Sequence, residues 1–418
     1  MGLEHISQYD LDNSDLHLCF IYFAVRTTHS MSQQFKNNSK YVWLLLASLV
    51  MAGSGIFTVN WPVQSSASNT TTESTAPTKS ALPNTNTIDH VILISVDGLR
   101  PEALLPPIVD QYPAMQQLTQ GAWTAQARCD PDSSITLPNH VDMLTGRLLV
   151  GEHGHGWVSN SDPPSRKMGG SLHLKADRYI SSVFDVAHDA GMQTAMIAGK
   201  WKFVLFGQSY GEDAGGPDGV APNDGQNKID CFIHSSDLMT QVEQLVAFIN
   251  VASQNQKRSF TFLHLALPDF TGHGAGWDLN EGSSYRKSLQ RIDQELASLL
   301  SKIQQSQSLA GRVAIVLTSD HGGGVPFTSH TDPEAPINFT IPFMVWSGVN
   351  QKPVDLYLIN KVSRHCPGAN ERFTPNQLPP IRNADAANVC LTLLGLPPVP
   401  GSTVNARQEL LVALPQPK

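Results

Sequence analysis

Residues 91–97 read Val-Ile-Leu-Ile-Ser-Val-Asp, and this stretch decides the fold. The run before the aspartate is apolar and rich in β-branched residues, which is typical of a strand covered on both faces. Comparable runs at 194–198, 260–267, 313–317 and 341–346 predict four more strands. We therefore expect the globular part of the chain to begin near its first buried strand.

Helical patterns separate these runs. Residues 180–190 end at Gly191, a favourable residue just after a helix, and residues 237–251 are amphipathic. Residues 285–303 place leucine and isoleucine side chains on one helix face, whereas residues 207–226 lack periodicity and predict a loop. The alternation of strand and helix predicts an α/β fold, a three-layer α/β/α sandwich with a largely parallel central sheet.

The N-terminal region, residues 1–64, differs from the rest of the chain. Lys36 and Lys40 precede an apolar run at about 41–59, which has the layout of a signal peptide and is also long enough to span a bilayer. No lysine or arginine follows this run until Lys79, so the positive-inside rule places the remainder outside the cytoplasm. We expect an exported protein, periplasmic or extracellular, with either a cleaved signal or an N-terminal membrane anchor.

Residues 65–88 are rich in Ser, Thr, Asn and Pro and predict a flexible linker, because they contain too little apolar surface to form a core. Residues 89–418 then form the predicted catalytic domain. Four cysteines lie in this domain without a Cys-x-x-Cys pair, which argues against a thiolate zinc site. An exported location permits disulfides, and four cysteines allow three pairings.

Composition argues against one class of partner. The 418 residues carry a formal net charge of −8, and lysine and arginine form no cluster. The sequence therefore gives no signal of nucleic-acid binding, and it gives none of an oligomeric state either.

Acidic residues follow three of the predicted strands. Asp97 and Asp269 each come just after a buried strand, and Asp320 and His321 follow a third. A single aspartate in this place is often only a turn or helix-cap residue. Because the carboxyl ends of parallel strands share one edge of a sheet, we expect these three carboxylates to converge, and converging carboxylates need a cation.

Two more histidines extend this set. His273 lies four residues after Asp269, a spacing that lets one helical turn direct both side chains at one ion, and His330 lies further along the chain. Mixed Asp/His ligation suits zinc better than magnesium or calcium, which prefer oxygen ligands. Manganese and iron remain alternatives. The sequence thus predicts a two-metal site.

Residues 132–146 contain a candidate nucleophile. Pro138 fits the first turn of a helix and Gly146 fits its end. Thr136 then lies at the helix N-terminus, where unpaired N–H groups favour an anion, but its hydroxyl needs a base or a metal to become a nucleophile. Without the metal ligands, Thr136 would be an ordinary first-turn residue. Asn139, one turn further, is predicted to donate to a phosphoryl oxygen of the substrate.

Together these segments resemble the motif series of the alkaline phosphatase superfamily. The motifs are Val-Asp97-Gly, Thr136-x-Pro-Asn-His, Pro-Asp269-x-x-Gly-His273, Ser-Asp320-His321-Gly and the later His330. Their order is most similar to that of the nucleotide pyrophosphatase/phosphodiesterase branch, over roughly residues 89–400. The resemblance implies an alkaline phosphatase-like fold and hydrolysis of small-molecule phosphate diesters or pyrophosphates.

The resemblance also implies a role for each residue. One Zn²⁺ ion would be held by Asp269, His273 and His330, and a second by Asp97, Asp320 and His321, with Thr136 on the second metal. Thr136 would form a phospho-threonyl intermediate. His330 lies in a Thr-Ser-His-Thr-Asp loop, so Asp332 is an alternative ligand. His140 belongs to a similar motif, and we interpret it as structural.

Departures from the superfamily pattern bear on the substrate. Monoester phosphatases of this superfamily hold the terminal phosphate with an arginine near the nucleophile, but no arginine follows Thr136 before Arg147. Asn139 instead suits a diester oxygen. Lys200 and Lys202 are predicted to bind a second charged group of the substrate, as in phosphonoacetate-hydrolase-like members, unless they are simply exposed lysines. We therefore expect a phosphodiesterase. A phosphonoacetate-type hydrolase, a phosphomonoesterase and a non-catalytic binding protein of this fold are the alternatives.

Overall fold

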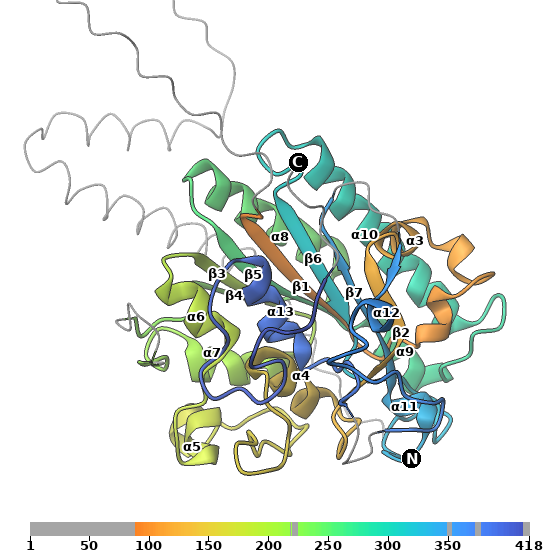
Figure 1. Ribbon diagram of the computed structural model, residues 1–418, viewed down its shortest axis with the longest axis horizontal. Helices are drawn as coiled ribbons and strands as arrows, with labels where there is room; N and C mark the ends of the chain where they lie inside the picture. Colours follow the sequence, from red (N-terminus) through yellow and green to blue (C-terminus); the bar gives the residue numbers. More distant parts are fainter. Residues whose placement is uncertain (1–87, 218, 220–224, 349–352, 373–377, 413–418) are drawn as a thin grey trace, which may run out of the picture. The chain divides into compact units, whose positions relative to one another are not determined.

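One sheet with the strand order β4-β3-β5-β1-β6-β7-β2-β8 organises the described part of the chain (Figure 1). The computed structural model describes residues 88–217, 219, 225–348, 353–372 and 378–412. The predicted N-terminal region (1–64) and the predicted linker (65–88, except its last residue) lie outside the described residues. The strands are β1 (His90–Val96), β2 (Ala122–Arg128), β3 (Gln193–Ala198), β4 (Cys231–His234), β5 (Ser259–Leu265), β6 (Val313–Thr318), β7 (Thr340–Trp346) and β8 (Val354–Asp355).

The sheet is largely parallel, as predicted. Strand β7 runs antiparallel to its neighbours β6 and β2, and the other pairings between the described strands are parallel. Every residue of β1 and of β6 is buried. These strands lie in the middle of the sheet and are covered on both faces, which is why their sequences are continuous apolar runs.

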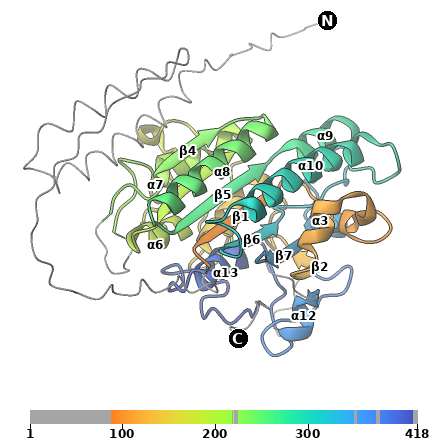
Figure 2. The same ribbon diagram turned by 90° about the horizontal axis from the view of Figure 1, so that it is seen from above.

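Helices cover both faces of the sheet (Figure 2). One layer consists of α3 (Pro113–Leu118), α8 (Leu238–Gln254), α9 (Leu267–Ala275) and α10 (Ser284–Gln305). The other layer includes α4 (Thr136–Thr145), α6 (Val183–Asp189) and α13 (Asp385–Leu393), and α13 packs on β1 and β6. The three-layer α/β/α prediction is therefore confirmed.

Shorter helices lie in the connections. They are α5 (Leu172–Ala176), α7 (Val204–Tyr210), α11 (Pro336–Phe339) and α12 (Leu356–Ile359), with 3₁₀ turns η1 (Pro101–Leu104), η2 (Val109–Gln111), η3 (Arg166–Met168) and η4 (Trp201–Phe203). The predicted loop at 207–226 is wrong at its start, because residues 207–210 end α7. There Leu205, Phe206 and Tyr210 are buried on one side of the helix.

Two predicted boundaries shift for local reasons. The helix predicted at 180–190 begins only at Val183, because the hydroxyl of Ser182 caps it by accepting from the N–H of Phe184. The strand predicted at 260–267 ends at Leu265, and Pro268 then occupies the first turn of α9. This earlier strand end moves Asp269 from a loop onto a helix.

Two further observations concern the predicted exported location. Among the described residues, no helix is both long enough and apolar enough to cross a membrane. Cys129, Cys366 and Cys390 are free thiols, so no disulfide joins any of them to another described cysteine.

Candidate metal centre and active site

Three neighbouring strands end level with one another at the edge of the sheet that carries the site. Val96 of β1 is in register with Leu265 of β5, and Ser95 of β1 with Thr318 of β6. Side chains that follow these strand ends therefore meet in space. They are Asp97, Asp269, Asp320 and His321, and all four are almost completely buried.

The first group of candidate ligands comprises Asp97, Asp320 and His321. Nε2 of His321 lies 3.1 Å from Oδ2 of Asp320 and 3.5 Å from Oδ1 of Asp97. Gly98 has a φ of +69°, and its N–H donates to Oδ1 of Asp320 at 3.1 Å. A glycine here lets the chain turn sharply between two carboxylates.

The second group comprises Asp269, His273 and His330. Oδ1 of Asp269 lies 3.4 Å from Nε2 of His273 and 3.6 Å from Nε2 of His330. Asp269 and His273 are four residues apart on α9, so one helical turn directs both inward, as the spacing predicted. His330 reaches the group from the loop after β6. Asp332, the alternative to His330, is in neither group, and its carboxylate accepts from the N–H of Glu334.

The two groups adjoin one another. Nε2 of His321 lies 4.0 Å from Oδ1 of Asp269. The rings of His321 and His330 stack with centroids 3.5 Å apart. The structure therefore brings all six predicted metal ligands together and divides them three and three, as the resemblance implied; five are buried and His273 is exposed.

Each candidate ligand histidine has one nitrogen bound to the backbone. Nδ1 of His273 donates to the carbonyl of Thr328, Nδ1 of His321 to that of Gly322, and Nδ1 of His330 to that of Ser134. These bonds hold the Nε2 lone pair toward the carboxylates, which is the usual arrangement of histidines that bind a metal.

Three buried carboxylate oxygens in the same region lack a hydrogen-bond donor among the described residues: Oδ1 of Asp97, Oδ1 of Asp269 and Oδ2 of Asp320. Leaving such oxygens unpaired is costly, and a bound cation removes the cost. The donor set of imidazole nitrogens and carboxylate oxygens suits zinc. The residues present therefore fit a pair of metal ions.

Burial and charge also set the protonation of these groups. Burial lowers the pKa of His321, and burial together with neighbouring His321 lowers the pKa of His330 to about 2, so both rings are neutral and able to bind a metal. Burial and the charge of Asp97 raise the pKa of Asp320 well above its usual value. Burial alone would raise the pKa of Asp97, but the ammonium of Lys200 and the ring of His264 hold it well below its usual value.

Thr136 begins α4 beside the first group. Its Oγ1 lies 3.3 Å from Nε2 of His321, and the residue is 1% exposed. Helix α4 ends at Gly146 with a left-handed φ of 63°, as predicted. The sequence therefore located both the candidate nucleophile and the helix that carries it.

The structure does not support the predicted role of Asn139. Its Oδ1 accepts from the N–H of Asp130 and from Nδ2 of Asn383, and its Nδ2 donates to the carbonyls of Ser133 and Ile135. The side chain is fully buried, and these bonds use its whole amide. Asn139 thus holds the segment before Thr136 in place and has no donor left for a substrate.

A different asparagine lies in the cavity beside Thr136. This cavity, of about 420 Å³, is lined by residues that include Thr136, Asn160, Lys200, Trp201 and Lys202. Oδ1 of Asn160 accepts from the N–H of Leu137 at 3.0 Å and from Nζ of Lys202 at 3.1 Å. Its Nδ2 has no acceptor among the described residues. No sequence pattern points to Asn160, because it lies in an irregular loop 24 residues after Thr136.

Lys200 lies deeper than predicted. Its Nζ is 2.5 Å from Oδ2 of Asp97 and 2.6 Å from Oδ2 of Asp269. The side chain is 7% exposed, which excludes the alternative of a simply exposed lysine. Lys202 faces the cavity.

Two histidines outside the predicted site support it. Nδ1 of His264 accepts from the N–H of Gly199, so its Nε2 carries the proton and donates to Oδ2 of Asp97 at 2.9 Å. His140 donates through Nδ1 to the carbonyl of Thr136 and accepts at Nε2 from Ser95, which agrees with its interpretation as structural. No sequence pattern distinguishes His264, because it is one polar residue within a buried apolar strand.

Comparison with known proteins places the chain in a family. Residues 91–326, more than half of the chain, match the family described as Type I phosphodiesterase / nucleotide pyrophosphatase. A search of curated proteins gave no match. Among solved structures, the lipoteichoic acid synthase LtaP from Listeria monocytogenes is similar at 11% identity, with a TM-score of 0.50 over 77% of this chain and 76% of that chain.

Two further structures resemble the chain at lower TM-scores. One is a protein in the alkaline phosphatase superfamily from Vibrio parahaemolyticus, at 12% identity and a TM-score of 0.47 over 77% of this chain and 70% of that one. The other is the C-terminal periplasmic domain of the phosphoethanolamine transferase EptC from Campylobacter jejuni, at 14% identity and a TM-score of 0.45 over 75% of this chain and 91% of that one.

The mostly parallel sheet between two helix layers is a fold that this chain shares with LtaP. The chain belongs to the Type I phosphodiesterase / nucleotide pyrophosphatase family, whose model matches more than half of it. The resemblance read from the sequence motifs is thereby confirmed.

Proposed function

We propose that this protein hydrolyses phosphate diester or pyrophosphate bonds of small molecules, with Thr136 as the nucleophile and two zinc ions as cofactors. One observation carries the proposal: Oγ1 of Thr136, 3.3 Å from Nε2 of His321, lies beside two carboxylate–histidine groups at a helix N-terminus. A buried hydroxyl beside buried unpaired carboxylate oxygens is hard to explain as packing.

The residues assigned to each metal are those of the two groups: Asp97, Asp320 and His321 for one ion, and Asp269, His273 and His330 for the other. Zinc bound there supplies charge that stabilises phosphoryl oxygens and lowers the pKa of a coordinated hydroxyl. We prefer zinc because half of the six ligands are imidazoles.

In the proposed reaction, Oγ1 of Thr136 attacks the phosphorus. A bond forms between Oγ1 and phosphorus while the bond from phosphorus to the leaving oxygen breaks, which gives a phospho-threonyl intermediate; the hydroxyl proton passes to solvent, and the leaving group departs as an alcohol or nucleotide after it takes up a proton from water. Water then attacks the phosphorus and breaks its bond to Oγ1, which regenerates the hydroxyl and releases a phosphate monoester. The N–H of Thr136 has no acceptor among the described residues, so it is available to a phosphoryl oxygen at the N-terminus of α4.

The rest of the cavity favours an anionic substrate. Asn160 and Lys202 line the cavity together with Thr136, while the half-exposed ring of Trp201 offers an apolar surface to the leaving group. We therefore assign to Asn160 the role that was predicted for Asn139, because a neutral donor suits a singly charged diester oxygen.

A second candidate, a phosphonoacetate-type hydrolase, is favoured by Lys202. This lysine donates a hydrogen bond to Asn160 in the cavity. Burial lowers the pKa of Lys202, and the positive charge of nearby Lys200 lowers it further. A substrate with a carboxylate beside its phosphoryl group would neutralise it. A phosphomonoesterase would use the same positive charge to hold a second phosphoryl charge.

Turnover of four substrates by the full-length protein separates these candidates. The panel is bis(p-nitrophenyl) phosphate, p-nitrophenyl phosphate, a nucleotide pyrophosphate and phosphonoacetate, each tested with EDTA and after zinc is added back. We expect the diester or the pyrophosphate to be turned over fastest, with activity lost in EDTA and restored by zinc. Faster turnover of the monoester, or turnover of phosphonoacetate alone, would replace the proposal with the corresponding alternative.

The variant Thr136→Ala tests the nucleophile. We expect at least a ~10³-fold loss of kcat with unchanged zinc content, because catalysis by positioning alone cannot replace the attacking oxygen. Unchanged diester turnover in this variant would show that the nucleophile is misassigned. An inactive wild-type protein that binds zinc would instead favour the non-catalytic alternative.

We also propose that the protein is exported, on the basis of Lys36, Lys40 and the apolar run at 41–59. Fractionation of cells that express the full chain tests this. Recovery of the protein in the cytoplasm would overturn it, and N-terminal sequencing of exported protein distinguishes a cleaved signal from a membrane anchor.

A further inference from the structure

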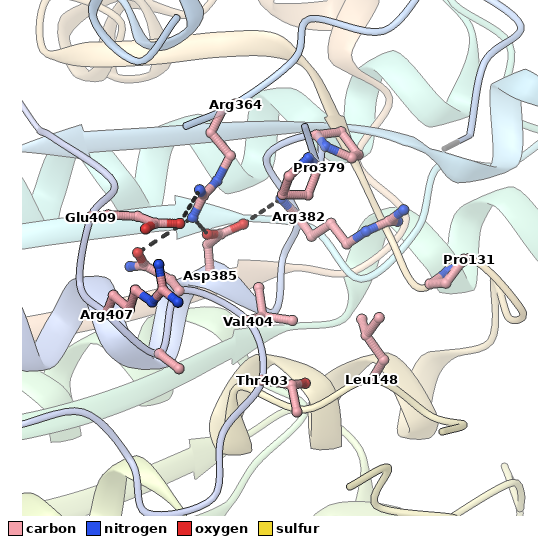
Figure 3. Close-up of a pocket in the computed structure, with 13 residues that line it drawn as sticks. Pro131, Leu148, Arg364, Pro379, Arg382, Asp385, Thr403, Val404, Arg407 and Glu409 are labelled. Atoms are coloured by element: carbon pink, nitrogen blue, oxygen red, sulfur yellow. Dashed lines mark hydrogen bonds and ion pairs between the residues drawn. The ribbon is translucent and has the colours of Figure 1, made fainter. Parts of the chain in front are cut away.

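A second cavity lies next to the two ends of α4, the helix that carries Thr136 (Figure 3). It shares no lining residue with the cavity at Thr136. Its volume is about 390 Å³, which is large enough for a small organic molecule. One wall comes from Pro131, in the segment before α4, and from Leu148, after that helix. The opposite walls come from residues 364–385 and 403–409.

The lining of this cavity carries a surplus of positive charge. Arg364, Arg382 and Arg407 line it together with two carboxylates, those of Asp385 and Glu409. Both carboxylates are bound by Arg364, whose Nη2 donates to Asp385 at 2.8 Å and whose Nη1 donates to Glu409 at 3.1 Å (Figure 3). Three guanidinium groups against two carboxylates leave one formal positive charge, which matches a singly charged anion.

Several hydrogen-bond donors among the lining residues lack an acceptor. Arg407 is exposed at the rim and makes no hydrogen bond or ion pair with any residue in the described part of the chain. Nε of Arg364 and Nδ2 of Asn405 also have no acceptor among the described residues, although these side chains are only 4% and 5% exposed. Buried donors without acceptors are costly, and an anion nearby would offset part of that cost electrostatically.

The remaining surface of the cavity is apolar. Pro131, Leu148, Pro379, Pro380 and Val404 contribute to it. From the apolar walls, the single surplus charge and the unbound guanidinium fork, we propose that this cavity binds a small monocarboxylate with a compact apolar body. The carboxylate pairs with Arg407 in the two-pronged geometry that guanidinium favours, and the body lies against the prolines and Val404.

Hydrogen bonds connect the lining of this cavity to α4 and to the segment before it. Nη1 of Arg382 donates to the carbonyl of Cys129, close to the start of α4. The next residue, Asn383, donates through Nδ2 to Oδ1 of Asn139 at 3.0 Å and to the carbonyl of the candidate metal ligand Asp320 at 3.4 Å. These contacts join the wall of the cavity to the segment before α4 and to the backbone of Asp320.

Calorimetric titration of the full-length protein with benzoate, and with the neutral amide benzamide, tests the binding. We expect one benzoate per chain and at least tenfold weaker binding of benzamide. Arg407→Ala should weaken benzoate binding at least tenfold, while Arg407→Lys retains part of it. Arg291→Ala, which removes an exposed arginine from α10, is the matched control and should bind like the wild type.

A second variant tests the cavity without changing charge. Val404→Trp fills the apolar part and should abolish benzoate binding while the protein stays folded by circular dichroism. The proposal is overturned if benzoate shows no saturable binding, if benzamide binds equally well, or if binding survives Arg407→Ala and is lost in EDTA, which would locate it at the metals.

Discussion

Nζ of Lys200 lies 2.5 Å from Oδ2 of Asp97, and it also lies 2.6 Å from Oδ2 of Asp269. One ammonium group therefore joins the two candidate metal groups. Burial alone would lower the pKa of Lys200, but the charges of Asp97 and Asp269 raise it above its usual value. Each aspartate gives Oδ2 to the lysine, while Oδ1 faces the histidines and has no donor.

Replacing this lysine should make the protein more dependent on metal. In Lys200→Met, two buried carboxylates lose their counter-charge, so we expect the zinc-free protein to lose about 3 kcal/mol in free energy of unfolding. Zinc removes the same repulsion, so its stabilising effect should be larger in the variant than in the wild type. Denaturant unfolding in EDTA and in excess zinc measures both quantities.

Lys202→Met is the matched control, because Lys202 bonds to Asn160 and to neither aspartate. It should leave the zinc-induced stabilisation unchanged. Equal stabilisation by zinc in the wild type and in Lys200→Met would mean that Lys200 does not neutralise the metal ligands.

His264 should affect metal binding without contacting the metal. Its Nε2–H donates to Oδ2 of Asp97, and its Nδ1 is fixed by the N–H of Gly199. Because such partners orient a ligand, His264→Ala should weaken zinc binding by about 10- to 100-fold, measured by competition with a chromogenic chelator. His173→Ala removes another well-bonded histidine, remote from the ligands, and should not change zinc affinity. A similar loss in both variants would indicate general destabilisation.

The sequence predicted the centre of the fold better than its edges. Strands β1, β5 and β6 are buried on both faces, so their apolar runs are visible without any knowledge of neighbours. Strand β2 was not predicted, because Ala122–Arg128 has no continuous apolar run; its alternation of apolar and polar residues, which is typical of a half-buried strand, was overlooked. Strand β4 has four residues and β8 has two, and their pairing depends on tertiary contacts.

The convergence of the candidate metal ligands was predictable because the acidic residues follow strands whose ends lie side by side. Asp97, Asp269 and Asp320 are placed by the sheet itself, so sequence position implies spatial position. Asn160 and His264 were missed for opposite reasons. Asn160 reaches the site from an irregular loop, whose path no periodicity reveals, and His264 is one polar residue within an apolar strand. Asn139 was assigned to the substrate because it lies one helical turn after Thr136. The four hydrogen bonds that occupy its amide depend on the tertiary structure and cannot be read from the sequence.

The two asparagines should therefore separate stability from catalysis. Asn139→Ala removes four buried hydrogen bonds and should lower the free energy of unfolding by about 3 kcal/mol or more. Asn160→Ala should cost about 1 kcal/mol and reduce diester kcat/KM by about 10²-fold, because Asn160 lines the cavity beside Thr136. Urea unfolding and diester kinetics measure the two effects. A stable Asn139→Ala protein with low activity would restore the original assignment of Asn139 to the substrate.

Stability should fall in mild acid partly because of His90, at the start of β1. Burial lowers the pKa of His90 from 6.5 to about 4, against the charge of Asp89, and its Nδ1 is hydrogen-bonded to Ser259. The unfolded chain binds this proton at a higher pH than the folded chain does. The stabilisation from neutral His90 is therefore present above pH 6.5 and is lost as the pH falls toward about 4. The full loss corresponds to about 3 kcal/mol.

The variant His90→Asn isolates this contribution. Asparagine can keep the hydrogen bond to Ser259 but does not titrate, so the free energy of unfolding should decline less steeply between pH 6.5 and 4 than in the wild type. Urea titrations at half-unit pH intervals measure the slope. If the slope of His90→Asn equals that of the wild type, the pKa of His90 is not depressed in the folded protein, because only a difference between folded and unfolded pKa values makes stability depend on pH.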